Sequence, residues 1–243
     1  GRYARIFMRR NLEDTGALDV PIACITDLDV MPDVAPWILG KLKEGEDIPE
    51  ISDSGRKWRI KSDFQGTALV DRREEVRNRA SGQTVETFVS DEWTFEYDLA
   101  FHGLMDSVWA AAHMALADDK LVTGKLEKGT IRQEARESLE TLNNGMSERD
   151  PVQTQEYLAS NVYAVFEKKN ASKAIAAQYL AEELEYLFES KDWDSSKLIA
   201  CLPPYVKSAI AHVTGAIQEG ADGSSQGGVA ELVEPESVDM EVA

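Results

Sequence analysis

The stretch Val20-Pro21-Ile22-Ala23-Cys24-Ile25-Thr26-Asp27-Leu28-Asp29 decides how this chain is interpreted. Its apolar run predicts a buried strand, and two carboxylates follow where the strand reaches the surface. Side chains two positions apart in an extended chain point to one side, so Asp27 and Asp29 are expected to share a divalent metal ion. The same pattern occurs where an aspartate caps a helix or satisfies a turn, so other segments must support a metal site.

A second strand is predicted at residues 84–89, because this segment has the β-branched and aromatic composition of a strand. A short helix of mixed charge, with a solvent-facing surface, is expected before it at residues 71–79. A basic amphipathic helix is likewise expected at residues 2–10, before the first strand. This alternating order predicts an α/β half.

From Thr94 onward, apolar residues recur at helical spacing, which predicts a bundle of helices. The predicted core positions are Tyr97, Phe101, Leu104, Val108 and Ala112; Leu158, Val162, Val165 and Phe166; Ile175, Tyr179, Leu184 and Phe188; and Val206, Ile210, Val213 and Ile217. Pro203-Pro204 is expected to open the last helix. We therefore divide the chain into an α/β domain (1–104), a helical domain that returns to it (105–217) and a tail (218–243).

Composition limits the class of protein. With 243 residues, of which 43% are hydrophobic, the chain can bury a substantial core. It contains no uninterrupted apolar run long enough for a membrane span, and no signal-peptide pattern at its start. Two cysteines and three histidines give no zinc motif, so a bound metal is expected to take oxygen ligands, as Mg²⁺ or Mn²⁺ does. A cytoplasmic location is the expectation.

The charge is strongly acidic, with a formal net value of -18. Residues 219–243 hold seven acidic residues and no Lys or Arg, and this tail is expected to be disordered. The remainder is also acidic, so bulk electrostatics do not favour DNA binding. A contact with phosphate would need a bridging metal ion or a basic partner.

A second acidic segment follows the second strand, with Glu96 and Asp98 after Thr94. Thr94 is suited to cap a helix, whose first turn favours carboxylates, so a local structural role explains part of this pattern. Ligands of open α/β sheets bind at the carboxyl ends of the strands, where Asp27 and Glu96 are both expected. Several carboxylates there predict a hard-metal site, while Asp98 is assigned a structural role.

At these residues the sequence resembles the Toprim domain of the OLD (overcoming lysogenization defect) endonucleases, relatives of the Gabija nuclease. The segments that carry the resemblance are Thr26-Asp27-Leu28-Asp29-Val30, Trp93-Thr94-Phe95-Glu96-Tyr97-Asp98-Leu99-Ala100, Lys173-Ala174-Ile175-Ala176-Ala177-Gln178-Tyr179-Leu180-Ala181 and Leu202-Pro203-Pro204-Tyr205-Val206-Lys207-Ser208-Ala209-Ile210. The resemblance covers most of residues 1–217. The implied fold is a Rossmann-like Toprim sheet with an appended all-helical domain.

The resemblance implies a DNA endonuclease that cleaves phosphodiester bonds with two divalent ions, Mg²⁺ or Mn²⁺, with Ca²⁺ as a further possibility. Asp27, Asp29, Thr94 and Glu96 would be metal ligands, and Asp27, Asp29 and Lys173 the catalytic residues. Such proteins carry an upstream ATPase domain that binds ATP, and the family suggests a helicase-like partner and a role in phage defence or DNA repair. These implications are expectations about this chain.

The chain departs from the Toprim pattern in one respect. The family has a glutamate at the end of an earlier strand, and no such element precedes Val20. We therefore expect the chain alone to cleave DNA poorly or not at all, with a companion segment supplying the missing strand.

Two other functions fit parts of the pattern. A non-catalytic, metal-stabilised interaction or oligomerisation module would use the amphipathic helices for protein contacts. The acidic charge of the chain is compatible with such a module. A sugar-nucleotide glycosyltransferase would use Asp27 and Asp29 as a metal clamp, but no acceptor-site motif supports it.

Overall fold

The computed structural model describes residues 6–8, 20–51, 55–146 and 150–215. The elements in these ranges are β1 (Ile22–Thr26), α1 (Ala35–Ile38), the 3₁₀ turn η2 (Lys61–Asp63), α3 (Ala68–Asn78), β2 (Val85–Val89), α4 (Phe95–Leu99), the π-helical segment η3 (Ala100–Leu104), α5 (Met105–Leu116), α6 (Asp118–Val122), α7 (Lys128–Asn144), α8 (Pro151–Lys169), α9 (Lys173–Glu189), α10 (Ser195–Cys201) and α11 (Pro204–Thr214). Most of the expected helix at 2–10 and all of the tail lie outside the described residues.

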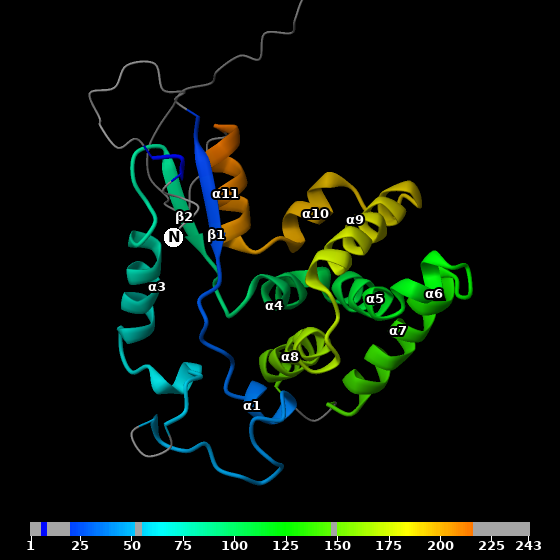
Figure 1. Ribbon diagram of the computed structural model, residues 1–243, viewed down its shortest axis with the longest axis horizontal. Coiled ribbons are helices and arrows are strands. Elements are labelled where there is room, and N and C mark those ends of the chain that lie inside the picture. Colours follow the sequence, from blue (N-terminus) through cyan, green and yellow to red (C-terminus); the bar gives the residue numbers. More distant parts are fainter. Residues whose placement is uncertain (1–5, 9–19, 52–54, 147–149, 216–243) are drawn as a thin grey trace, which may run out of the picture.

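The two strands form a parallel pair, in which Ile22 lies opposite Val85 and Thr26 opposite Val89. In Figure 1, α3 lies on one side of this pair and α11 on the other. Phe88 packs against α11, while Val89 packs toward α3. The described residues therefore form a mixed α/β fold in which the sheet is small, and the predicted alternation of helix and strand is confirmed from residue 68 to residue 89.

The helical half is organised around α5, most of whose residues are buried. It packs against α7, α8 and α9. The indole N–H of Trp109 donates to the carbonyl of Ala135 at 2.8 Å, which fixes α5 to α7. The predicted core positions Tyr97, Leu104 and Val162 are buried, so the assignment of this region to a helical bundle is confirmed.

Helix α11 departs from the predicted core pattern. Pro204 opens it, as expected, but Ile210 and Val213 are exposed rather than buried. Its buried face consists of Tyr205, Val206 and Ala209. The reason is that α11 packs on two short strands and not inside a bundle, so only a narrow face is covered.

Gly103 lies where α4, η3 and α5 join into one bent helical run. Its φ of +133° lies in the region that favours glycine, and an added Cβ would lie 3.0 Å from the sulfur of Cys201. A glycine is therefore needed here for both backbone conformation and space. None of the described helices is long and apolar enough to cross a membrane.

Candidate metal centre at the strand ends

The loops that follow β1 and β2 are bonded to each other. The amide of Leu28 donates to the hydroxyl of Ser90 at 2.8 Å and to the carbonyl of Trp93 at 3.0 Å. The amide of Ser90 donates to the carbonyl of Thr26 at 2.9 Å, and its hydroxyl donates to Trp93. Because Ser90 is fully buried, these bonds fix the carboxyl ends of the two strands as one unit.

Asp98 shapes the loop between β2 and α4. Its carboxylate accepts from the backbone amides of Asp91 at 2.8 Å, Glu92 at 3.2 Å and Trp93 at 3.0 Å. Burial raises the pKa of Asp98 to about 7, against the opposing effect of these three donors. The structural role expected for Asp98 agrees with these bonds.

Asp27 lies directly after β1 and is partly buried. Its Oδ1 accepts from the backbone amide of Phe95 at 2.9 Å, which joins it to the first turn of α4. Burial raises the pKa of Asp27, and the carboxylates of Glu96 and Asp29 act in the same direction. The Phe95 bond and the Lys173 ammonium act against them. Asp27 is thus close to charged groups from three separate segments.

Glu96 and Lys173 form an ion pair across the site. The Lys173 ammonium donates to Glu96 Oε2 at 2.8 Å and lies 5.2 Å from the centre of the Tyr163 ring. Lys173 is the first residue of α9, which Ser172 caps. Burial raises the pKa of Tyr163 to about 12, with Glu167, Glu96 and Asp27 contributing. The ring and the carboxylate together hold the ammonium beside the strand ends.

The other two predicted ligands are Asp29 and Thr94. Asp29 is exposed and has a left-handed backbone with φ of 59°, because β1 ends at Thr26. Asp27 and Asp29 nevertheless line the same cavity of about 310 Å³, together with Arg72 of α3 and Arg79, which directly follows α3. The two acids share this cavity through loop conformation and not through strand alternation.

The buried hydroxyl of Thr94 caps α4 by accepting from the amide of Tyr97 at 3.4 Å. A metal-ligating role for Thr94 stays a prediction. Among the described ranges, no group of three or more His, Cys, Asp or Glu side chains is arranged to hold a metal ion. Carboxylate oxygens such as those of Asp27 and Glu96 are ligands that Mg²⁺ and Mn²⁺ prefer.

Sequence reasoning did not anticipate Tyr163 or the bond between Asp27 and Phe95. Tyr163 lies in an ordinary apolar stripe of α8, so nothing in the local sequence distinguishes it from a core aromatic residue. Its contact with Lys173 depends on how α8 and α9 pack. Comparisons of this chain with models of protein families, with curated proteins and with solved structures found no match.

Proposed function

We propose that this chain carries the nuclease part of a metal-dependent DNA endonuclease with a Toprim-like α/β unit. The observation that carries the proposal is the meeting of Asp27 from the end of β1, Glu96 from α4 and Lys173 from α9 at one edge of the sheet. Their separation in sequence makes a local role insufficient to explain all three. Carboxylates with a nearby ammonium suit the binding and hydrolysis of a phosphodiester.

The bound metal ions would activate a water molecule and stabilise the leaving oxygen. Asp27 and Glu96, with Asp29, would hold them, and the Phe95 amide keeps the Asp27 carboxylate in place. Lys173 would neutralise charge that develops on the phosphate, which requires its ammonium to move from Glu96 toward the substrate. The Tyr163 ring stabilises the ammonium in its present position, beside Glu96.

The wider assignments belong to the same proposal. We propose two ions, Mg²⁺ or Mn²⁺, a further acidic ligand from a companion strand, an upstream ATPase domain and a cytoplasmic setting. DNA is the proposed substrate, and a helicase-like protein is a proposed partner.

The test is relaxation of supercoiled plasmid by the longest native polypeptide that contains these residues, with Mg²⁺, Mn²⁺ or EDTA. We expect cleavage that requires the metal and falls by about a hundredfold or more in Asp27→Asn and in Lys173→Met. Asp47→Asn and Lys125→Met make the same chemical changes at exposed loop positions and serve as matched controls. Equal cleavage by all variants would overturn the assignment.

A structural role is the competing explanation, and the ion pair itself favours it. The bond between Lys173 and Glu96 links α9 to α4 without any metal. Because the Lys173 side chain is 46% exposed, the pair is expected to stabilise the fold by less than about 1 kcal/mol. A non-catalytic module predicts no cleavage by the native protein and a stability loss as the only effect of Lys173→Met.

A further inference from the structure

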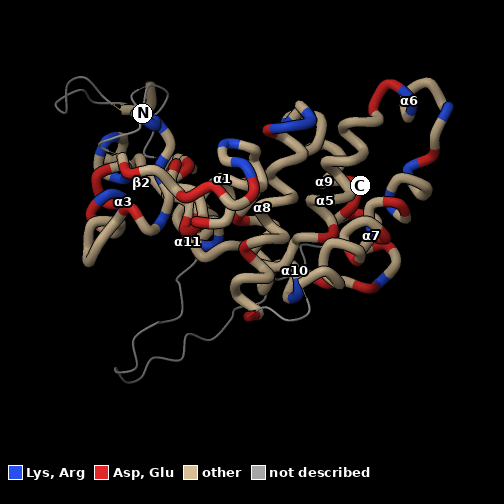
Figure 2. The backbone as a smooth tube through the Cα atoms, turned by 90° about the horizontal axis from the view of Figure 1, so that it is seen from below, with Lys and Arg blue, Asp and Glu red and all other residues tan. Residues whose placement is uncertain are grey.

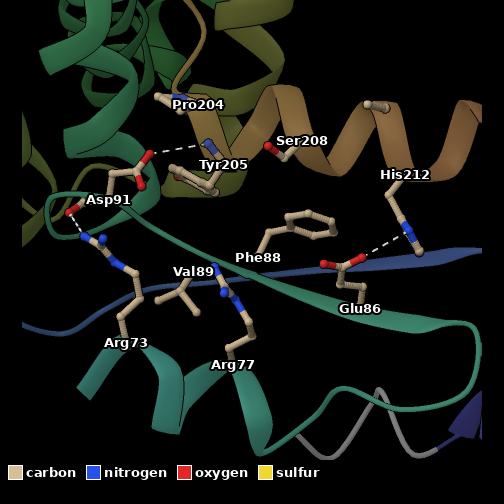
Figure 3. A pocket seen from close by; sticks show the side chains of 11 residues that line it. Arg73, Arg77, Glu86, Phe88, Val89, Asp91, Pro204, Tyr205, Ser208 and His212 are labelled. Atoms are coloured by element: carbon tan, nitrogen blue, oxygen red, sulfur yellow. Dashed lines mark hydrogen bonds and ion pairs between the residues drawn. The ribbon is translucent and has the colours of Figure 1, made fainter. Parts of the chain in front are cut away.

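A second pocket lies at the outer side of β2, between α3 and α11 (Figure 3). Its volume is about 500 Å³. The side chains that line it include Arg73, Arg77, Glu86, Asp91, Tyr205 and Ser208. This pocket is distinct from the cavity that Asp27 and Asp29 line, and the roles proposed above do not use it.

Two arginines enter the pocket from the same face of α3, one helical turn apart. In Figure 3 both side chains extend from α3 toward β2. Arg73 donates to the carbonyl of Asp91 at 2.5 Å, and its buried Nε has no partner among the described residues. Arg77 pairs with Glu74 at 2.7 Å on the helix surface, where both side chains are more than 40% exposed. Such an exposed pair is weak, so Arg77 can redirect its donors at little cost.

The acidic side chains of the pocket are engaged by other groups. Glu86 lies 3.3 Å from His212, which comes from α11. Asp91 accepts from the backbone amide of Tyr205 at 3.4 Å. The arginines thus retain donor capacity, while the carboxylates are partly compensated. Figure 2 shows basic and acidic positions mixed along α3, so this positive charge is local in an acidic chain.

Tyr205 supplies a second, independent indication of a ligand. Its side chain is 94% buried, since its exposed fraction is 6%, yet its hydroxyl has no hydrogen-bond partner among the described residues. Burial raises the pKa of Tyr205, and the carboxylates of Asp98, Asp27 and Asp91 add to the effect, so the hydroxyl stays protonated as a donor. A buried hydroxyl without a partner destabilises the fold, so an acceptor brought by a ligand would be stabilising at this position.

We propose that this pocket binds a phosphate group of a DNA strand, through Arg73, Arg77 and the hydroxyl of Tyr205. This inference rests on the proposed nuclease function, which supplies DNA as the ligand. Guanidinium groups and hydroxyls match the oxygens of a phosphate, and the first turn of α11 adds a favourable helix dipole. Asp91 lines the pocket, and its backbone amide donates to Asp98 of α4, the helix that carries Glu96, so the pocket adjoins the candidate metal centre. A phosphate held here would position a strand for cleavage at that centre.

The test measures binding of a short fluorescein-labelled DNA duplex to the 243-residue chain by anisotropy, in EDTA and at low salt. We expect Tyr205→Phe and Arg77→Gln each to weaken binding about tenfold, as the loss of a bond to a charged group does. Arg136→Gln removes the same charge from an exposed position of α7 and should change binding by less than about twofold. Tyr205→Phe removes a hydroxyl without a protein partner, so its melting temperature should match or exceed that of the native chain.

Inorganic phosphate is the second probe, followed by ³¹P line broadening with the same variants. Phosphate binding that depends on Tyr205 and Arg77, without any such dependence for the duplex, would support the site and overturn DNA as its ligand. Equal binding of both probes by the native chain and both variants would overturn the proposal. Because EDTA removes metal, binding is measured without cleavage. If the longest native polypeptide does not cleave plasmid but this chain binds the duplex through Tyr205 and Arg77, the nuclease assignment is overturned and the phosphate site is not.

Discussion

Replacing Asp98 with alanine tests whether this carboxylate organises the loop that carries the candidate site. The change leaves three backbone amides without their acceptor, and the amide of Trp93 is fully buried. A buried donor without a partner costs about 1 to 3 kcal/mol, while the two partly buried amides regain water and cost less. We expect the free energy of unfolding to fall by about 3 kcal/mol, and by about half as much in Asp98→Asn, whose amide oxygen still accepts bonds.

The assay is urea unfolding followed by tryptophan fluorescence, with Asp47→Ala as a control that changes an exposed aspartate. The pH dependence gives a second readout. Because the pKa of Asp98 is about 7 in the folded chain, the folded state keeps a proton that the unfolded state releases near pH 4. Stability should therefore fall as pH rises from about 4 to 7, and Asp98→Asn should lack this component. Equal stability of Asp98→Ala and Asp47→Ala would show that the Asp98 carboxylate does not organise this loop.

Three further predictions concern other parts of the chain. Gly103→Ala places a methyl group 3.0 Å from the sulfur of Cys201 at a positive φ, so the free energy of unfolding should fall by about 2 kcal/mol or more, measured by urea unfolding. Arg132→Met leaves the buried carboxylate of Glu183 without its two guanidinium bonds and should cost about 3 kcal/mol, whereas the double variant with Glu183→Leu should recover much of this loss in a double-mutant cycle. Burial raises the pKa of Asp27, so Mn²⁺ affinity should fall as pH drops through that raised pKa, because the carboxylate must lose its proton to bind; calorimetry between pH 5 and about 8 measures this.

The sequence was most informative about local structure. The apolar run before Asp27 and the β-branched run ending at Val89 predicted two strands, because both patterns reflect burial on a sheet. Helical spacing predicted the bundle, since α5 and its neighbours pack on their apolar faces. The pattern failed at α11, where Ile210 and Val213 continue the apolar spacing but face solvent. Periodicity identifies a helix, but the partner that covers it decides which face is buried.

The candidate site was less accessible to sequence reasoning. Local chemistry pointed to Asp27 and Glu96 at strand ends, but Lys173 entered only through the family resemblance. Its bond to Glu96 requires that α9 fold back over α4, which no short-range pattern specifies. The expected alternation of Asp27 and Asp29 assumed that the strand continued to Asp29. Position Asp29 instead has a left-handed conformation, which is a property of the loop.

We propose that Asp27 and Glu96 bind a divalent metal ion, and that Lys173 pairs with Glu96 when the metal is absent. Titration of Mn²⁺ into the native chain, followed by electron paramagnetic resonance, tests it directly. We expect the native chain to bind Mn²⁺ and both Asp27→Asn and Glu96→Gln to lose this binding. Lys173→Met should bind Mn²⁺ several-fold more tightly, because the ammonium no longer pairs with Glu96. Identical Mn²⁺ binding by the native chain and all three variants would contradict it.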